Sequence, residues 1–90
     1  MNERFHVLFF GRVQGVGFRF TTRDIAGRFA VLGLVRNLPD GSVELIAEGE
    51  TSELERFVQA VRDEMDRFIT NHIITRSASR GDFVSFEIQR

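Results

Sequence analysis

Three glycines fall within residues 11–17 (GRVQGVG), directly ahead of a segment with the apolar spacing of a helix. The first N–H groups of a helix have no partner inside the helix and lie at the positive end of its dipole. Glycine lets the backbone curl and approach a ligand closely. Arg19 falls in the first helical turn, where a bound anion would offset its unfavourable charge and accept two hydrogen bonds. The pattern predicts an anion site, although a loop that only makes the turn would contain the same glycines.

Asn37 is a second polar residue that needs a reason, because it lies beside Val35 and Leu38 in a short apolar segment. One interpretation is that its amide hydrogen-bonds to the backbone of the turn at residues 39–41 (PDG). The other is that the amide orients a water molecule or a substrate oxygen near the glycine-rich loop. Both interpretations are open at this point.

Composition excludes several kinds of chemistry. The 90 residues include 12 arginines, no lysine and no cysteine, so lysine Schiff bases, thiolate nucleophiles, disulfides and cysteine metal sites are ruled out. His6 and His72 alone make a weak metal site, and we expect no metal. The glycine spacing also departs from the GxGxxG fingerprint of dinucleotide-binding proteins.

Charge and hydropathy exclude further classes of protein. The net charge is −1 and no basic stripe stands out, which argues against a nucleic-acid binder. No apolar run approaches the roughly 20 residues of a membrane span, so we expect no membrane partner. The first residues (MNER) do not resemble a secretory signal, and we expect a cytoplasmic protein.

The loop must be positioned by a strand before it and a helix after it. Residues 4–10 (RFHVLFF) are typical of a mostly buried strand. The helix is expected to end with Gly33 as the residue after its last turn, and to bury one stripe: Phe18, Thr22, Ile25, Phe29 and Leu32. Residues 34–38 and 42–48 are expected to form a hairpin. Its second strand places three residues on the face away from the core: Glu44, Ile46 and Glu48.

The second half of the chain predicts another helix and further strands. The helix is expected to start around Thr51, with Ser52 and Glu55 as a capping box. Its apolar stripe comprises Leu54, Phe57, Val58, Val61, Met65 and Phe68, and its solvated face Glu53, Glu55, Asp63, Glu64 and Asp66. Residues 69–76 and 83–88 are expected to be strands, separated by a loop, and the last strand shows on one face Val84, Phe86 and Ile88.

The predicted order is βαββαβ, with a further strand near the C-terminus left open. It indicates an α+β fold, a ferredoxin-like sandwich in which two helices cover one face of an antiparallel sheet. We expect residues 1–90 to form a single domain.

Two segments resemble the signature blocks of the acylphosphatase family. Residues 11–19 (GRVQGVGFR) match G-x-V-Q-G-V-x-F-R, and residues 33–44 (GLVRNLPDGSVE) match G-x-V-x-N followed by D-G-x-V-E. The resemblance implies hydrolysis of acyl phosphates to a carboxylate and inorganic phosphate. It implies that Arg19 binds the substrate phosphate and Asn37 positions the attacking water. The phosphate oxygens would be cradled by the backbone of Gln14, Gly15, Val16, Gly17, Phe18 and Arg19.

This reaction does not require the residue types that the chain lacks. The leaving group is a carboxylate, which is stable near neutral pH without a strong general acid. Phosphoryl transfer mainly needs its phosphate oxygens held and neutralised. We therefore expect a metal-independent, cofactor-free monomer acting on a small acyl phosphate. The alternative is a non-catalytic ferredoxin-like module that binds RNA or protein, or that regulates a larger enzyme. Glu44 and Glu48 on the open sheet face argue against RNA.

Overall fold

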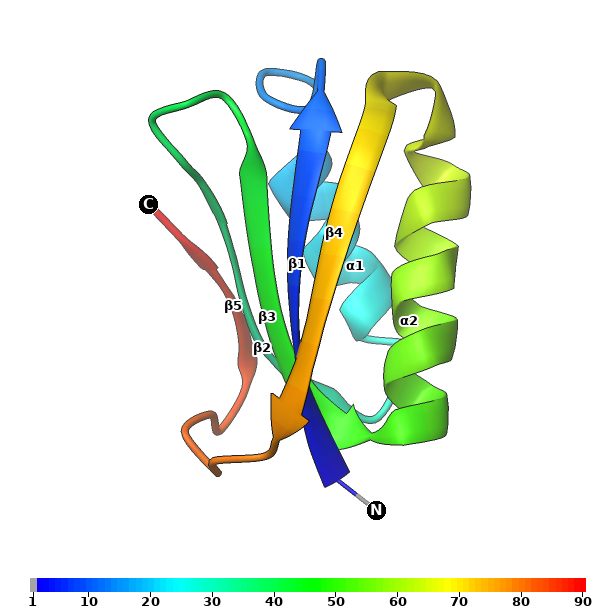
Figure 1. Ribbon diagram of the computed structural model, residues 1–90, viewed down its shortest axis with the longest axis vertical. Coiled ribbons are helices and arrows are strands. Elements are labelled where there is room, and N and C mark those ends of the chain that lie inside the picture. The colour runs from blue at the N-terminus through cyan, green and yellow to red at the C-terminus, as the bar shows by residue number, and fades with distance from the viewer. Residues whose placement is uncertain (1) are drawn as a thin grey trace.

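Two α-helices and five strands make up residues 2–90, the part of the chain that this computed structural model describes (Figure 1). In chain order they are β1 (Asn2–Gly11), α1 (Phe18–Ala26), β2 (Val31–Asn37), β3 (Val43–Glu50), α2 (Thr51–Glu64), a short 3₁₀ helix (Asp66–Phe68), β4 (Ile69–Ala78) and β5 (Phe86–Gln89). No helix within residues 2–90 has the length and apolar character to cross a membrane.

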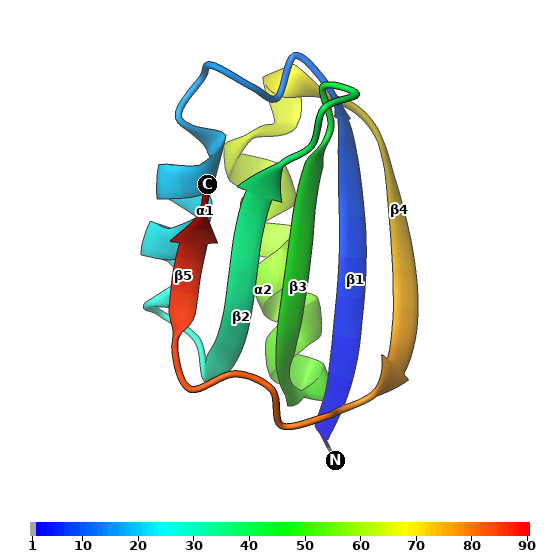
Figure 2. The ribbon, with the colours of Figure 1, turned by 90° about the vertical axis from the view of Figure 1, so that its left-hand side faces the viewer.

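The strands form one sheet in the order β4-β1-β3-β2-β5, and both helices lie on one face of it (Figures 1 and 2). The predicted ferredoxin-like sandwich is confirmed, and the strand left open near the C-terminus is present as β5. The pairs among β4, β1, β3 and β2 are antiparallel, as expected, and only the further strand β5 pairs with its neighbour β2 in parallel. After β4 the chain passes along the lower end of the sheet in Figure 2 to the opposite edge, and β5 then runs in the same direction as β2.

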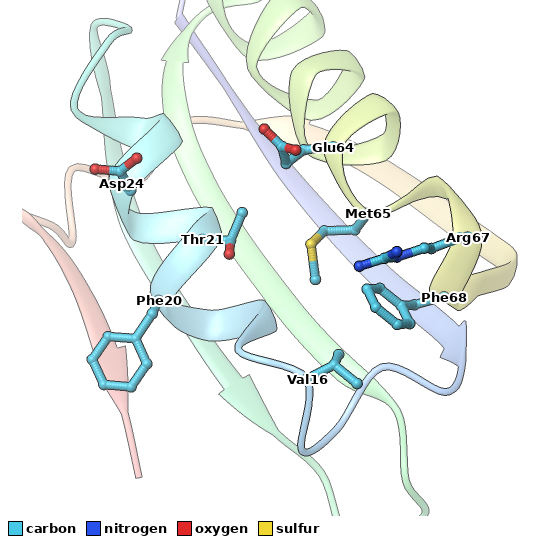
Figure 3. Close-up of a pocket in the computed structure, with 8 residues that line it drawn as sticks. All are labelled: Val16, Phe20, Thr21, Asp24, Glu64, Met65, Arg67 and Phe68. Atoms are coloured by element: carbon cyan, nitrogen blue, oxygen red, sulfur yellow. The ribbon is translucent and has the colours of Figure 1, made fainter.

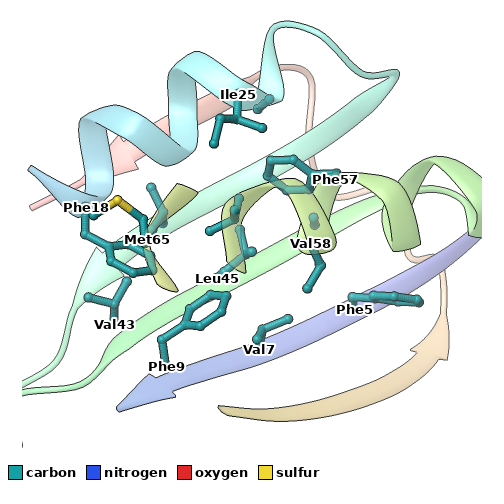
Figure 4. Close-up of a cluster of buried hydrophobic side chains, with 14 of the residues drawn as sticks. Phe5, Val7, Phe9, Phe18, Ile25, Val43, Leu45, Phe57, Val58 and Met65 are labelled. Atoms are coloured by element: carbon teal, nitrogen blue, oxygen red, sulfur yellow. The ribbon is translucent and has the colours of Figure 1, made fainter. Parts of the chain in front are cut away.

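The core lies between the sheet and the helices (Figure 4). Alternate residues of β1 and β3 point toward the helices, as the period of two along a strand requires. The buried positions on these strands are Phe5, Val7, Phe9, Val43, Leu45 and Ala47, and the facing helices contribute Phe18, Ile25, Leu54, Phe57, Val58 and Val61. Burying apolar surface of this kind is the main stabilising term for a domain without disulfides.

The first helix is shorter than its apolar spacing indicates. It ends at Ala26, and the N–H of Gly27 closes it by bonding to the carbonyls of Arg23 and Asp24. Gly33, expected as the residue just past the helix, lies inside β2. A Cβ atom there would lie 1.9 Å from the Ile46 carbonyl oxygen, so glycine is required for the close approach of β3. Phe29 and Leu32 therefore lie outside the helix.

Three expectations in the second half are also wrong. The α2 helix begins at Thr51 with Glu50 as its N-cap and no capping side chain. The expected box does not form, because Ser52 lies inside the first turn, where its hydroxyl donates to Glu50. Glu53 is not simply solvated, because it accepts the Ala30 N–H at 2.9 Å. Val84 precedes β5 and is 92% exposed, so it does not share a packed face with the strand.

Glu48 holds the segment between β4 and β5 in place through hydrogen bonds. Its carboxylate is 6% exposed and accepts the backbone N–H groups of Arg80 and Gly81 at 3.0 and 2.9 Å. The Ser79 hydroxyl and the Arg4 guanidinium donate to it at 2.9 and 2.8 Å. Burial alone would raise the pKa of Glu48, but these four donors outweigh it and lower the pKa to about 2.

Replacing this carboxylate, Glu48→Gln, is expected to lower the free energy of unfolding by about 3 kcal/mol at neutral pH. That figure follows from a pKa of 4.5 in the unfolded chain and about 2 in the folded protein. The melting temperature should fall by roughly 10–20 °C. Because the folded pKa is the lower one, the contribution is present above about pH 4.5 and is lost as the pH falls toward 2.

Thermal melts across this pH range, beside Glu64→Gln as an exposed control, measure the effect. A Glu48→Gln deficit that equals the control, or that does not shrink in acid, would contradict the role given to the carboxylate.

Candidate active site

The loop between β1 and α1 lies at the same end of the sheet as the turn between β2 and β3 (Figure 2). Gly15 and Gly17 both have φ 77°, the left-handed region that favours glycine. Gly17 is the N-cap of α1, and no side chain within residues 2–90 caps that helix. The first turn of α1 also contains no acidic residue. The positive end of α1 therefore faces the loop without a protein carboxylate beside it.

Two contacts fix the loop. The Arg12 N–H donates to the Phe68 carbonyl at 2.9 Å, which ties the loop to the end of the 3₁₀ helix. The Gln14 side-chain amide donates to the carbonyls of Leu38 and Ser42, each at 2.8 Å. The Gln14 amide group is therefore occupied by the β2–β3 turn, and only its backbone is left to face an anion.

The β2–β3 turn is closed by its own residues, at the position expected from the PDG sequence. The Gly41 N–H bonds to the Leu38 carbonyl, and the Asp40 carboxylate accepts the N–H and the hydroxyl of Ser42. The Ser42 hydroxyl and N–H lower the pKa of Asp40 below its ordinary value. These bonds leave no turn contact that requires Asn37.

A hollow of about 130 Å³ brings the predicted site residues together. Arg19 reaches it from α1 and Asn37 from the end of β2, and the rest of its lining consists of Val13, Gly15, Gly17, Phe18 and Phe20. At about 30 Å³ for each water molecule in the liquid, this is room for about four waters. Gln14 and Val16, also predicted, lie in the same loop but outside this lining.

The side chains of Arg19 and Asn37 are both partly buried without a bonding partner in the described part of the chain. Both are half-buried, and neither side chain forms a hydrogen bond or ion pair with another residue of the described range 2–90. The Arg19 guanidinium lies close to an uncapped helix start, and its positive charge has no counter-ion among residues 2–90. The arrangement can hold a small anion by two guanidinium bonds and by loop N–H groups, with an amide beside it.

Phe20 also lines the hollow, a position that was not expected from the sequence. The signal was present in the helical spacing, because Phe20 lies off the buried stripe of α1 and is 57% exposed. A larger groove of about 520 Å³ lies on the other side of α1, toward the end of α2 (Figure 3). Val16, Met65 and Phe68 give it an apolar floor, and Asp24 and Glu64 lie at its rim.

The two histidines lie away from the hollow. His6 bonds to Glu44 at 2.7 Å on the open face of the sheet. Burial opposes ionisation of Glu44, but bonds from His6 and Arg36 outweigh it and lower its pKa. Burial and the nearby Arg62 lower the pKa of His72. No three His, Asp or Glu side chains in residues 2–90 are grouped closely enough to hold a metal ion.

Comparisons with known proteins agree over most of the chain. The acylphosphatase family model matches residues 5–88. The acylphosphatase of Syntrophobacter fumaroxidans is 42% identical over 96% of this chain and 90% of that protein. A shorter match to the acylphosphatase of Latilactobacillus sakei, 57% identical, spans 59% of this chain and 58% of that protein. The crystal structure of acylphosphatase from Bacillus subtilis superposes with a TM-score of 0.88 at 33% identity, over 98% of this chain and 99% of that one.

Proposed function

Because the chain belongs to the acylphosphatase family of acid-anhydride hydrolases, we propose that it hydrolyses small acyl phosphates in the hollow between Arg19, Asn37 and the glycine-rich loop. The products are a carboxylate and inorganic phosphate. The observation that carries the proposal is the half-buried Arg19 guanidinium, which lies without a protein counter-ion at an uncapped helix start. An anionic phosphoryl group supplies the missing charge.

In this proposal Arg19 and the loop bind different oxygens of the substrate phosphate. The planar guanidinium grips two phosphate oxygens, and N–H groups between residues 14 and 19 bind the others at the positive end of α1. The same groups neutralise the charge that spreads over the phosphate oxygens in the transition state. The left-handed Gly15 and Gly17 support this part of the proposal, because they let the backbone curve around a ligand.

Asn37 directs the water in this proposal. Its amide, which has no partner within residues 2–90, bonds to a water molecule in line with the bond between phosphorus and the acyl oxygen. The water oxygen forms a bond to phosphorus as the bond from phosphorus to the acyl oxygen breaks. The electron pair leaves with the carboxylate, and the proton of the water passes to a phosphate oxygen of the substrate. The amide itself orients the water and does not accept its proton.

Turnover of acetyl phosphate by the purified protein tests the function. We expect release of acetate and inorganic phosphate in equal amounts. Binding of acetyl phosphate without turnover would instead support the non-catalytic alternative. A monomeric state, a cytoplasmic location and the lack of nucleic-acid or membrane partners stay predictions.

Chelation is expected to leave the activity intact. In this proposal Arg19 and the backbone N–H groups supply the positive charge that a metal ion supplies in other phosphoryl-transfer enzymes. Acetyl phosphate turnover should therefore be the same with and without excess EDTA. Loss of activity in EDTA that Mg²⁺ restores would contradict the metal-independent mechanism.

A further inference from the structure

Phe20 carries the most exposed side chain in the lining of the hollow. Val13 and Phe18 are buried, Arg19 and Asn37 are half-buried, and the glycines have no side chain. The Phe20 ring is 57% exposed and projects from α1 away from Met65 and Phe68 (Figure 3). Phe20 lines the mouth of the hollow, and it also borders the larger groove on its other side.

Arg23 lies over this ring. Its guanidinium carbon is 5.4 Å from the ring centroid, within the range of a cation–π interaction. Arg23 forms no ion pair with any residue of the range 2–90, so the Phe20 ring is the group that holds it. Arg19 precedes Arg23 by four residues, and the two arginines share one side of the helix. Phe20 and Arg19 line the same hollow, so an aromatic ring borders the site at which Arg19 binds the substrate in the proposed function.

A single exposed apolar side chain needs no functional explanation. The position of Phe20 distinguishes it from Ile73, which is 50% exposed on the distant edge strand β4 and lines no described pocket. Phosphate held by Arg19 lies inside the hollow, and its acyl substituent must leave on the side away from the attacking water. A substituent that extends from the half-buried Arg19 toward solvent meets the ring at the mouth.

We infer that Phe20 determines which acyl group the enzyme prefers. Its ring stacks on a flat, aromatic acyl group, so loss of the ring weakens the use of an aromatic acyl phosphate more than the use of acetyl phosphate. Stacked aromatic pairs contribute enough to change kcat/KM by about three- to tenfold. The inference rests on the proposed function, because it assumes that the hollow holds the phosphoryl group.

Benzoyl phosphate and acetyl phosphate, compared in the wild type and in Phe20→Ala, test the inference. The ratio of their kcat/KM values, benzoyl over acetyl, is expected to fall about three- to tenfold in Phe20→Ala, mainly through a higher KM for benzoyl phosphate. Phe20→Tyr keeps the ring and should keep the ratio. Ile73→Ala, the matched loss of an exposed apolar side chain, should keep it as well.

The outcomes separate this inference from the proposed function. If the wild type hydrolyses neither substrate, the proposed function fails. If it hydrolyses both and Phe20→Ala keeps the wild-type ratio, or loses both activities equally, the assignment of Phe20 fails alone. Inhibition by inorganic phosphate, measured in each variant, checks that the loop is intact, and Phe20→Leu replaces Phe20→Ala if the latter does not fold.

Discussion

Lysine at position 19 is expected to restore almost none of the activity that alanine removes. Both variants should lower kcat/KM for acetyl phosphate by about 10³-fold. Lysine keeps the positive charge, but it lacks the planar pair of donors that can bind two phosphate oxygens at once. Its ammonium group also lies at a different distance from the helix than the guanidinium, which misaligns the phosphoryl group with the water. Steady-state kinetics of Arg19→Lys and Arg19→Ala measure this directly.

Arg12→Lys is the matched control, because Arg12 lies in the same loop but is exposed and lies outside the lining of the hollow. It should retain activity. Near-wild-type turnover by Arg19→Lys would reduce Arg19 to a general electrostatic contact.

Thermal melts locate the anion independently of turnover. A ligand that binds only the folded state raises the melting temperature. Phosphate should therefore stabilise the wild type, and the shift should shrink in both Arg19 variants. A shift that is unchanged in Arg19→Ala would move the anion site away from this loop.

Removing the amide at position 37, Asn37→Ala, is expected to lower kcat by about 10²–10³-fold while the inhibition constant for phosphate changes little. The amide aligns water, and the anion is held by Arg19 and the loop. Collapse of phosphate binding with kcat preserved would reverse the assigned roles.

The interpretation of Asn37 as a turn residue makes a different prediction. It expects a lower melting temperature with the activity of each folded molecule unchanged. Asn71→Ala, an exposed asparagine on β4, serves as the control for loss of an amide on a strand.

The residues of the candidate site could be predicted from the sequence because their signals are local. The glycines of the loop and the PDG turn each act within a few residues, and the strand–loop–helix order follows from a change of apolar period between neighbouring segments. The contact partners were not predictable in the same way. Gln14 bonds to the β2–β3 turn, which lies 24 and 28 residues further along the chain, and nothing near Gln14 in the sequence indicates it.

The wrong predictions about the fold have the same physical origin. Phe29 and Leu32 continue the spacing of a helix, but Gly33 must pass close to the backbone of β3, and that contact decides where β2 runs. The parallel pairing of β5 and the grip of Glu48 on residues 79–81 likewise depend on partners distant in sequence. Local propensity does not contain such contacts, and tertiary pairing overrides it.

The bond from the Arg12 N–H to the Phe68 carbonyl also bears on how the protein acquires its activity. Arg19 and Asn37 both lie in the first half of the chain, yet the loop between β1 and α1 is anchored by a residue that follows α2. During synthesis, a nascent chain that ends before Phe68 contains both side chains without the anchor of the loop. Closing this contact requires most of the chain to be ordered, a step whose entropy cost rises slowly with the length enclosed. We therefore expect turnover to depend on the fold of the chain up to and including Phe68, and not on the first half alone.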